Sequence, residues 1–330
     1  MTDLPSWGVA SDSPTAQHYR VFGANEARGS SEIYEDWALS VAEDAEVLAL
    51  IDELPRPKRQ ANLVFAAARV AGVPVAPWSR ARTAVIERWG RIREVAETRA
   101  TQTNEAARCA VLLPVLSRIP GPIALLEVGA SAGLCLYPER YAYRYTGADG
   151  TITSLDPAVA SDVVIECAIV DAAPPERLPE VAWRAGVDLN PLDPADPATL
   201  DWLDALIWPE HDDRRARLRA AAAVAASDPA PIRAGDLNEA VLDAAASAPA
   251  DATLVVFHTA VLAYLRPEER TRFAATMERS DAVWISNEGA GVFPEWETTL
   301  PADRRHSFVL AVDGRPVALT HPHGRSYRGL

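Results

Sequence analysis

The residues whose types and spacing could do chemistry lie in one short segment, residues 123–135. An apolar run there contains Glu127 and is followed by Gly129, Ser131 and Gly133 at intervals of two. The run predicts a buried strand, and the spaced glycines predict a tight loop that leads into a helix. A strand, loop and helix in this order can bring backbone N–H groups and a carboxylate to a nucleotide-like ligand.

Two chemistries are compatible with this segment. Taken with its acid, it resembles the first motif of S-adenosylmethionine-dependent methyltransferases, which implies that Glu127 lies near the charged methionine end of the cofactor. Gly129 and Gly133 would then let the backbone approach closely. Without the acid, the spacing matches the nucleophile elbow of α/β-hydrolases, with Ser131 as the nucleophile. A turn that needs small residues only for packing is the third interpretation.

The context favours the methyltransferase interpretation. A hydrolase elbow follows several strands and usually a glycine-rich oxyanion loop, whereas the residues before Pro120 have a helical pattern. From about residue 30 to 119 we expect helices near 32–50 and 59–71, and others that begin near Ser79 and Thr103, the last kinked at Pro114. We therefore expect residues 1–120 to form an N-terminal helical cap.

Residues 121–330 are expected to form the core of an α/β fold. After the strand that contains Glu127, a β-rich insertion is expected at about 141–180, followed by strands that alternate with helices. This alternation predicts a mostly parallel, Rossmann-like sheet of the methyltransferase type that ends in an antiparallel hairpin. The expected later strands are 181–188, 231–236, 252–259 and 281–288, and the expected hairpin joins 306–312 to 316–320.

Composition and charge limit the possible partners. The chain has 330 residues, 48% of them hydrophobic, and a formal net charge of −14. Nucleic acid is not expected as a partner, because phosphate binding needs clustered Lys and Arg, and the one basic cluster, 214–219, is expected to be a solvated helix face. The amino terminus lacks a signal-peptide pattern, and the longest apolar window is too short to span a bilayer. We expect a soluble cytoplasmic protein with no membrane partner and leave its oligomeric state open.

No metal site or disulfide is predicted. Cys109, Cys135 and Cys167 are far apart in the sequence and form no C-x-x-C, which indicates buried small side chains. His321 and His323 are separated by a proline that fixes an extended local chain, so their rings are expected to point in different directions.

The whole set of motifs resembles an uncharacterised bacterial family, the domain of unknown function DUF2332, and resembles methyltransferases more widely. The resemblance covers nearly the whole chain. It rests on Gly29-Ser-Ser31, Thr103-Asn-Glu105, Leu126 to Gly133, Asp188 to Asp193, Trp208-Pro-Glu210, Val255 to His258, Ser286 to Gly289 and His321-Pro-His-Gly324. It implies S-adenosylmethionine as the cofactor but does not supply an acceptor. Ser131 stands where methyltransferases usually have glycine.

Further cofactor contacts are expected from acids at strand ends. Asp188 ends its strand where an acid can accept hydrogen bonds from both ribose hydroxyls, and Asp236 could contact an adenine amino group. In the preceding helical part, Glu105 and Arg108 either pair on their own helix or face the loop at Gly129.

The expected catalytic residues are His258 and Glu288. Ligands of parallel α/β sheets lie beyond the carboxyl ends of the strands, and histidine titrates near neutral pH, so His258 is the candidate base. Glu288 could orient His258 or bind the acceptor. A core histidine bonded to its surroundings is an equally favoured alternative. The residues expected to contact an acceptor are Thr259, Asn287, Glu210 and His323.

The sequence thus predicts an S-adenosylmethionine-dependent methyltransferase that acts on a small-molecule acceptor. A non-catalytic member that keeps the fold as a ligand sensor or assembly partner is the alternative, followed by a serine hydrolase that uses Ser131.

Overall fold

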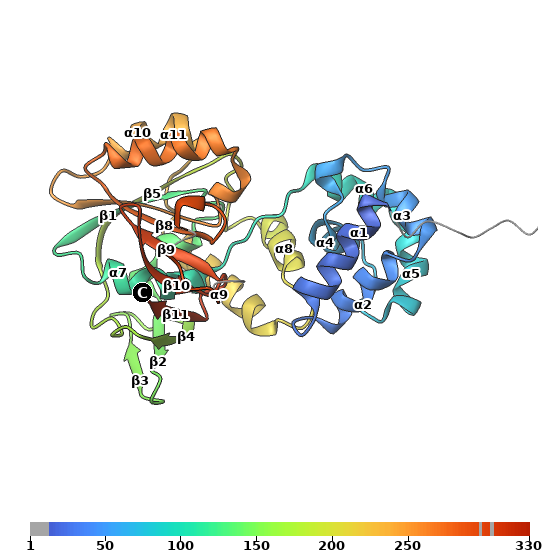
Figure 1. Ribbon diagram of the computed structural model, residues 1–330, viewed down its shortest axis with the longest axis horizontal. Coiled ribbons are helices and arrows are strands. Elements are labelled where there is room, and N and C mark those ends of the chain that lie inside the picture. Colours follow the sequence, from blue (N-terminus) through green and yellow to red (C-terminus); the bar gives the residue numbers. More distant parts are fainter. Residues whose placement is uncertain (1–12, 297–298, 304–306) are drawn as a thin grey trace, which may run out of the picture. The chain divides into compact units, whose positions relative to one another are not determined.

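The computed structural model describes residues 13–296, 299–303 and 307–330, which form two compact units (Figure 1). The helical unit contains residues 13–103 and 197–215, and the sheet unit contains residues 104–196 and 216–330. The division differs from the expected boundary at residue 120. Helix α7 (Cys109–Leu116) belongs to the sheet unit, where the apolar helix packs against strand β4, and the helical unit includes a segment from the second half of the chain.

The helical unit consists of short helices, some of which begin at side-chain caps. Ser31 Oγ accepts a hydrogen bond from the Tyr34 N–H, and Asp44 accepts one from the Val47 N–H, so the single helix expected at 32–50 is divided at Asp44. The elements of this unit are α1 (Pro14–Val21), the π-helix η1 (Phe22–Ala27), α2 (Glu32–Val41), α3 (Ala45–Ile51), η2 (Arg56–Lys58), α4 (Ala61–Val70), α5 (Trp78–Glu87), α6 (Trp89–Thr98) and α8 (Pro197–Leu206).

Aromatic side chains make up the centre of the helical unit. Tyr19, Tyr34 and Trp37 are fully buried and pack around Phe65 with ring centroids 5.1 to 5.7 Å away. The edge-on and tilted geometry of such pairs adds to the stability gained by burying their area. This unit therefore has a hydrophobic core of its own.

The sheet unit is built on one eleven-stranded sheet with the order β3-β2-β4-β11-β10-β9-β8-β7-β1-β5-β6. Six of the ten neighbouring pairs are parallel, and β8-β9, β9-β10, β10-β11 and β2-β3 are antiparallel. The strands are β1 (Pro122–Val128), β2 (Ala142–Thr146), β3 (Ile152–Leu155), β4 (Val164–Val170), β5 (Glu180–Asp188), β6 (Ile232–Ala234), β7 (Thr253–Thr259), β8 (Val283–Gly289), β9 (Phe308–Val312), β10 (Arg315–Thr320) and β11 (Ser326–Gly329).

The expected mixed α/β sheet with an antiparallel hairpin is confirmed. The first residue expected for that hairpin, His306, lies outside the described residues. The β-rich insertion, β2 to β4, is continuous with the main sheet because β4 pairs in parallel with β11, a strand that sequence reasoning did not predict. No helix among the described residues is both long enough and apolar enough to cross a bilayer.

The chain after β1 does not form the expected α-helix. Two 3₁₀ turns, η4 (Leu134–Leu136) and η5 (Pro138–Arg140), follow Gly133, and β2 begins directly after them. Pro138 lacks an N–H to donate, and the side chains of η4 are buried, so the chain turns back into the sheet. The backbone N–H groups expected at a helix start after β1 therefore belong to a loop and two 3₁₀ turns.

Helix α7 contains Pro114, as expected, and a side chain of the sheet replaces the backbone hydrogen bond that the proline removes. Proline has no N–H, so the carbonyl of Ala110, four residues earlier, lacks its helical donor. The hydroxyl of Tyr145 on β2 donates to Ala110 O at 2.7 Å and replaces it.

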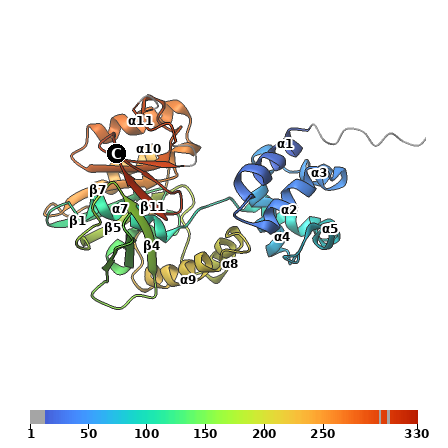
Figure 2. The ribbon, with the colours of Figure 1, turned by 60° about the horizontal axis from the view of Figure 1, so that its bottom comes forward.

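Helices α10 (Leu237–Ala245) and α11 (Pro267–Glu278) lie side by side over one face of the sheet (Figures 1 and 2). Leu126, Val128 and Val256 pack there against residues of both helices, such as Val241 and Phe273. We call this the α10/α11 face. Because successive side chains of a strand alternate, Glu127 between Leu126 and Val128 belongs to the opposite face. The remaining elements are η3 (Ala106–Arg108), α9 (Asp212–Ser227), which begins in the helical unit and continues into the sheet unit, η6 (Leu262–Tyr264) and η7 (Pro294–Trp296).

Candidate functional site at the carboxyl ends of the central strands

The loop after β1 lies close to its neighbouring strand because two positions lack side chains. Gly129 has φ +71° and, like Ala130, donates its N–H to the carbonyl of Val187 on β5. A Cβ on Gly186 would lie 2.7 Å from the Cβ of Ala130, so glycine is also required on β5. These contacts hold the loop, residues 129–133, against the end of β5.

Ser131 is strained and is held by polar side chains. Its φ of +51° lies in the left-handed region, which non-glycine residues rarely adopt. Asp188 accepts the Ser131 N–H at 2.8 Å, while Asn104 donates to Ser131 Oγ at 2.8 Å and accepts the Ala132 N–H at 2.9 Å. Asp188 also accepts the N–H of Asn190 at 2.7 Å. The acid expected to bind a ribose thus fixes the loop, with one backbone donor on each carboxylate oxygen.

The hydroxyl of Ser131 is bonded to an amide and not to a base. A hydrolytic serine needs a neighbouring group that can take its proton. The Asn104 side chain donates to Ser131 Oγ and cannot act in this way. The backbone at Ser131 resembles that of a nucleophile, but the side chain bonded to its hydroxyl is not a general base.

Glu127 places a buried carboxyl group beneath the loop. Only 4% of the residue is exposed, and its Oε2 has no hydrogen-bond partner among the described residues. Burial, and then the neighbouring Cys135 and Asp188, raise the pKa of Glu127 well above its usual value, against the opposing effect of Arg108. Because an unpaired buried polar atom is costly, Glu127 is a candidate contact for a ligand.

The expected catalytic residues lie on one face of the sheet, and two of the expected acceptor-binding residues, Thr259 and Asn287, lie on the other. His258 is paired in register with Ser286, and Thr259 with Asn287, so residues 258 and 259 point to different sides. The His258 ring contacts Phe273 of α11 at 5.5 Å between centroids, which places His258 and Glu288 on the α10/α11 face. The opposite face contains Thr259, Asn287 and Glu127.

Both ring nitrogens of His258 are engaged in hydrogen bonds. Trp284 Nε1–H can only donate, and it lies 3.0 Å from His258 Nε2, so Nε2 is the acceptor. The proton is therefore on Nδ1, which donates to Glu288 Oε1 at 2.7 Å. His258 is fully buried. In this arrangement the ring is the neutral tautomer, and its only lone pair is already used by Trp284.

Glu288 holds the backbone that follows β7. Its Oε1 also accepts the N–H groups of Val261 and Leu262 at 2.9 and 3.1 Å. Within the described residues, Glu288 Oε2 has no partner. Ala260, the first residue after β7, has φ +58° and donates its N–H to the carbonyl of Asn287 at 3.0 Å. Strained non-glycine residues therefore follow both β1 and β7 at the same edge of the sheet.

On the opposite face, Arg108 is joined to the end of β7. Its Nη1 donates to Thr259 O at 3.1 Å and to Thr259 Oγ1 at 3.2 Å. Beside it, Thr320 donates to Asn287 Oδ1 at 2.7 Å, which leaves Asn287 Nδ2 buried and without a partner among the described residues. Thr259 and Asn287 thus lie side by side at the ends of β7 and β8.

A short segment, residues 104–108, spans the ends of these strands. Asn104 binds the loop after β1, and Arg108 Nε donates to the carbonyl of Pro322 at 2.9 Å in the turn between β10 and β11. Gly324 in that turn fits so closely that a Cβ would lie 2.0 Å from the carbonyl of Ala107. This segment therefore faces the loop at Gly129, the second of the two positions expected for Glu105 and Arg108.

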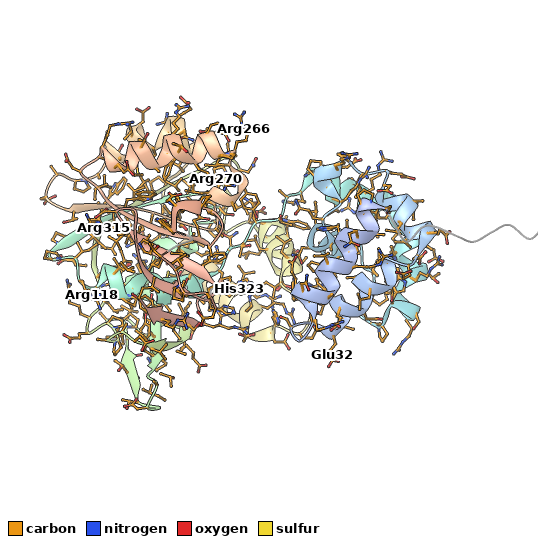
Figure 3. All side chains as sticks on the ribbon, in the orientation of Figure 1. Glu32, Arg118, Arg266, Arg270, Arg315 and His323 are labelled. Carbon is orange, nitrogen blue, oxygen red and sulfur yellow. The ribbon has the colours of Figure 1, made fainter. Side chains whose placement is uncertain are left out.

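His323 and Glu105 lie at the edge of this segment. His323, labelled in Figure 3, has its Nδ1 4.0 Å from Glu105 Oε2. Glu105 Oε1 also accepts from Arg217 Nε at 3.1 Å. One arginine of the cluster 214–219 therefore pairs with a buried acid. Arg215 pairs with Asp212 in the helical unit, but only 16% of its side chain is exposed, so it does not form the expected solvated face.

Two other expected contacts have structural partners elsewhere. Asp236 is the N-cap of α10 and accepts the N–H of Asn238 at 2.8 Å. Glu210 belongs to the helical unit, where its Oε1 accepts the N–H of Ile33 at 3.0 Å. Each carboxylate therefore has a structural role that needs no ligand.

The three cysteines are free and buried, as expected. Cys109 and Cys135 are neighbours in space, with Cys109 Sγ 3.6 Å from the carbonyl of Cys135. Contact with Cys109, followed by burial, raises the pKa of Cys135 well above its ordinary value. Burial raises the pKa of Cys167 to about 12, so its thiol is protonated at neutral pH. Within the described part of the chain, no group of three His, Cys, Asp or Glu side chains could hold a metal ion.

Sequence reasoning missed three residues of the site: Trp284, Val261 and Thr320. Each has an apolar or small side chain in a strand or turn, and its role depends on the strand pairing. The alternation of side chains along β7 and β8 was a signal that could have separated His258 from Thr259 in advance.

The chain matches, from residue 16 to 328, the model of a family described as "Uncharacterized protein conserved in bacteria (DUF2332)". No curated protein and no solved structure matches it.

Proposed function

This chain belongs to the DUF2332 family of uncharacterised bacterial proteins, and from its own residues we propose that it is an S-adenosylmethionine-dependent methyltransferase with a small-molecule acceptor. One observation carries the proposal: a buried carboxyl group with an open oxygen, Glu127, lies under a strained glycine loop at the end of the central strand. Such a group is suited to the ammonium of a bound amino-acid moiety.

The strand order supports a ligand at this position. Numbered along the chain, the parallel strands β6-β5-β1-β7-β8 have the order 3-2-1-4-5, as in Rossmann-type sheets. The chain runs from β1 to one side and returns to β7 on the other, so the topological switch point lies between β1 and β7. Ligands of open α/β sheets bind outside the carboxyl ends of the strands at such a point. Both strained residues, Ser131 and Ala260, lie there.

The residues proposed to hold the cofactor divide into direct and supporting contacts. Glu127 would accept from the ammonium. Gly129 and Gly133 would shape the loop beside the ligand, because Val261 and Ile232 occupy the space that their missing side chains leave free. Ser131 and Asp188 fix the loop through the bond between them, and Asp188 has lone pairs left for a ribose hydroxyl. Asp236 would have to contact the adenine amino group while its carboxylate also accepts the N–H of Asn238 as the N-cap of α10. The bound cofactor would supply an electrophilic methyl group on a sulfonium.

The acceptor would lie on the same face as Glu127. Thr259 and Asn287 end the two strands beyond the switch point, and the unpartnered Nδ2 of Asn287 would donate to an acceptor oxygen. His323 is about one-third exposed beside Glu105, so it could contact the acceptor and take a proton from it. His258 and Glu288, on the α10/α11 face, would act by holding the turn after β7. Most of the rate would then come from aligning the acceptor with the methyl group.

Calorimetric titration with S-adenosylhomocysteine tests the proposal. Micromolar binding by the wild-type protein is expected, and Glu127→Gln should weaken it about tenfold or more, since a hydrogen bond to a charged group contributes roughly 1.5 to 3 kcal/mol. Glu139→Gln is the matched control. Glu139 also has a buried oxygen without a partner among the described residues, but it is paired with Arg184 at 2.6 Å.

Proton release provides a second readout of the same contact. Because burial favours the protonated form of Glu127, an arriving ammonium should ionise it and release a proton. Titrations in two buffers with different ionisation enthalpies should detect this release in the wild-type protein and not in Glu127→Gln. A folded protein that binds no S-adenosylhomocysteine would refute the proposal. Binding without methylation in any acceptor screen would favour the non-catalytic alternative.

A further inference from the structure

A chain of hydrogen bonds on the α10/α11 face ends on the backbone of the turn after β7. Trp284 Nε1–H donates to His258 Nε2 at 3.0 Å, and His258 Nδ1–H donates to Glu288 Oε1 at 2.7 Å. The same oxygen accepts the N–H groups of Val261 and Leu262. Because Trp284 fixes which nitrogen carries the proton, it also fixes the orientation in which the imidazole supports the carboxylate.

The turn held by this chain is the one that contacts the glycine loop. A Cβ on Gly129 would lie only 2.4 Å from Cγ2 of Val261, so the isopropyl group occupies the space that glycine leaves free. Ala260, just before it, is held in the left-handed region by its bond to the carbonyl of Asn287. The position of Val261 is therefore coupled to the loop on one side and to Glu288 on the other.

We infer that His258 is a positioning residue: acting through Glu288, it sets the turn at residues 260–262 against the glycine loop at Gly129. It is not the base of the reaction, because its lone pair is used by Trp284 and its ring lies on the face away from Glu127 and Thr259. The inference deepens the proposed function, since the loop is the proposed cofactor site. Its structural part can be tested without any ligand.

Two substitutions of His258 by amide residues separate the roles of its two ring nitrogens. In His258→Asn, the side-chain amide can occupy the place of Nδ1 and still donate to Glu288. In His258→Gln, the longer side chain can place its amide oxygen at the position of Nε2 and accept from Trp284, but it loses the donor beside Glu288. Ser286→Ala is the matched control, because Ser286 is the register partner of His258 on β8 and its buried hydroxyl has no partner among the described residues.

The readout is amide hydrogen exchange at Val261 and Leu262 in the ligand-free protein, with the amide of Val255 in β7 as the internal reference. His258→Gln should speed exchange at the two turn amides about tenfold or more, whereas His258→Asn and Ser286→Ala should stay within about threefold of wild type. Exchange at Val255 should not change, which separates a local effect from general destabilisation. If His258→Gln does not fold, Glu288→Gln makes the same test by weakening the common acceptor, and it too should speed exchange at the two turn amides.

Equal exchange in His258→Asn and His258→Gln, or unchanged exchange in His258→Gln, would overturn the inference. Affinity for S-adenosylhomocysteine should follow the exchange data, with loss in His258→Gln and retention in His258→Asn. A base would instead lose methyl transfer in both variants and keep the affinity in both. If the wild-type protein binds no S-adenosylhomocysteine, the proposed function fails, and the exchange measurements still decide the inference.

Discussion

Replacing Gly129 by alanine should destabilise the sheet unit by about 3 kcal/mol. Two costs contribute. A non-glycine residue at φ +71° costs about 1 kcal/mol, and the new Cβ at 2.4 Å from Val261 Cγ2 forces a repacking that costs roughly 2 kcal/mol. Gly121, just before β1, supplies the control. Its φ is +72°, but no atom lies within 4 Å of the position of its Cβ, so Gly121→Ala should cost only about 1 kcal/mol.

A double-mutant cycle tests whether contact with Val261 causes the larger loss of stability in Gly129→Ala than in Gly121→Ala. Val261→Ala removes the two methyl groups that a Cβ at position 129 would meet, and leaves the Val261 Cβ at 3.1 Å. The double variant should therefore be more stable than the sum of the single effects by about 1 to 2 kcal/mol. Urea denaturation measures this, with the midpoint and the m value compared on the transition of the sheet unit. Equal losses in Gly129→Ala and Gly121→Ala, or an additive cycle, would refute the packing argument.

Three further outcomes are expected. The pKa of the Glu127 carboxyl is raised in the folded protein, so its contribution to the unfolding free energy is complete below the unfolded pKa near 4.5. As the pH rises from there towards the folded pKa, that contribution falls by about 1.4 kcal/mol per pH unit. Plots of unfolding free energy against pH for wild type and Glu127→Gln should diverge over that range, and parallel plots would contradict the raised pKa. Asp236→Ala should lower the unfolding free energy by about 1 kcal/mol through loss of the N-cap, and Asp236→Asn by only a few tenths; thermal denaturation compares them, and equal losses would argue against capping. Ser131 should remain unlabelled by a fluorophosphonate probe in mass spectrometry, because Asn104 cannot activate it; a covalent adduct at Ser131 would restore the hydrolase interpretation.

Local patterns in the sequence predicted most of the elements. The apolar run that begins at Ile123 and the strands expected at 252–259 and 281–288 became β1, β7 and β8, because apolar side chains in such segments bury both faces of a parallel strand. The helix start expected near 32 and the helix end expected near 71 coincide with the cap Ser31 and with Gly72, which has φ +81°, because caps act within a few residues. Predictions of this kind need no knowledge of distant contacts.

Elements that depend on distant partners were predicted less well. The helix expected after Gly133 is replaced by 3₁₀ turns, since buried side chains and Pro138 lead the chain directly into β2. Strand β11, only four residues long, forms by pairing with β10 and β4. The domain boundary expected at 120 is at 103 instead, because α7 is apolar enough to pack against the sheet.

By itself the sequence determined the α/β class, the central strand with its acid, and the tight glycine-spaced loop after it, because these follow from local propensity and from the alternation of side chains along a strand. Tertiary structure decided which residues form the site. Register pairs Thr259 with Asn287 and His258 with Ser286, so adjacent residues of β7 serve different faces. Trp284 occupies the lone pair that would have made His258 a base. Such assignments depend on distances between strands far apart in the chain, which no local pattern encodes.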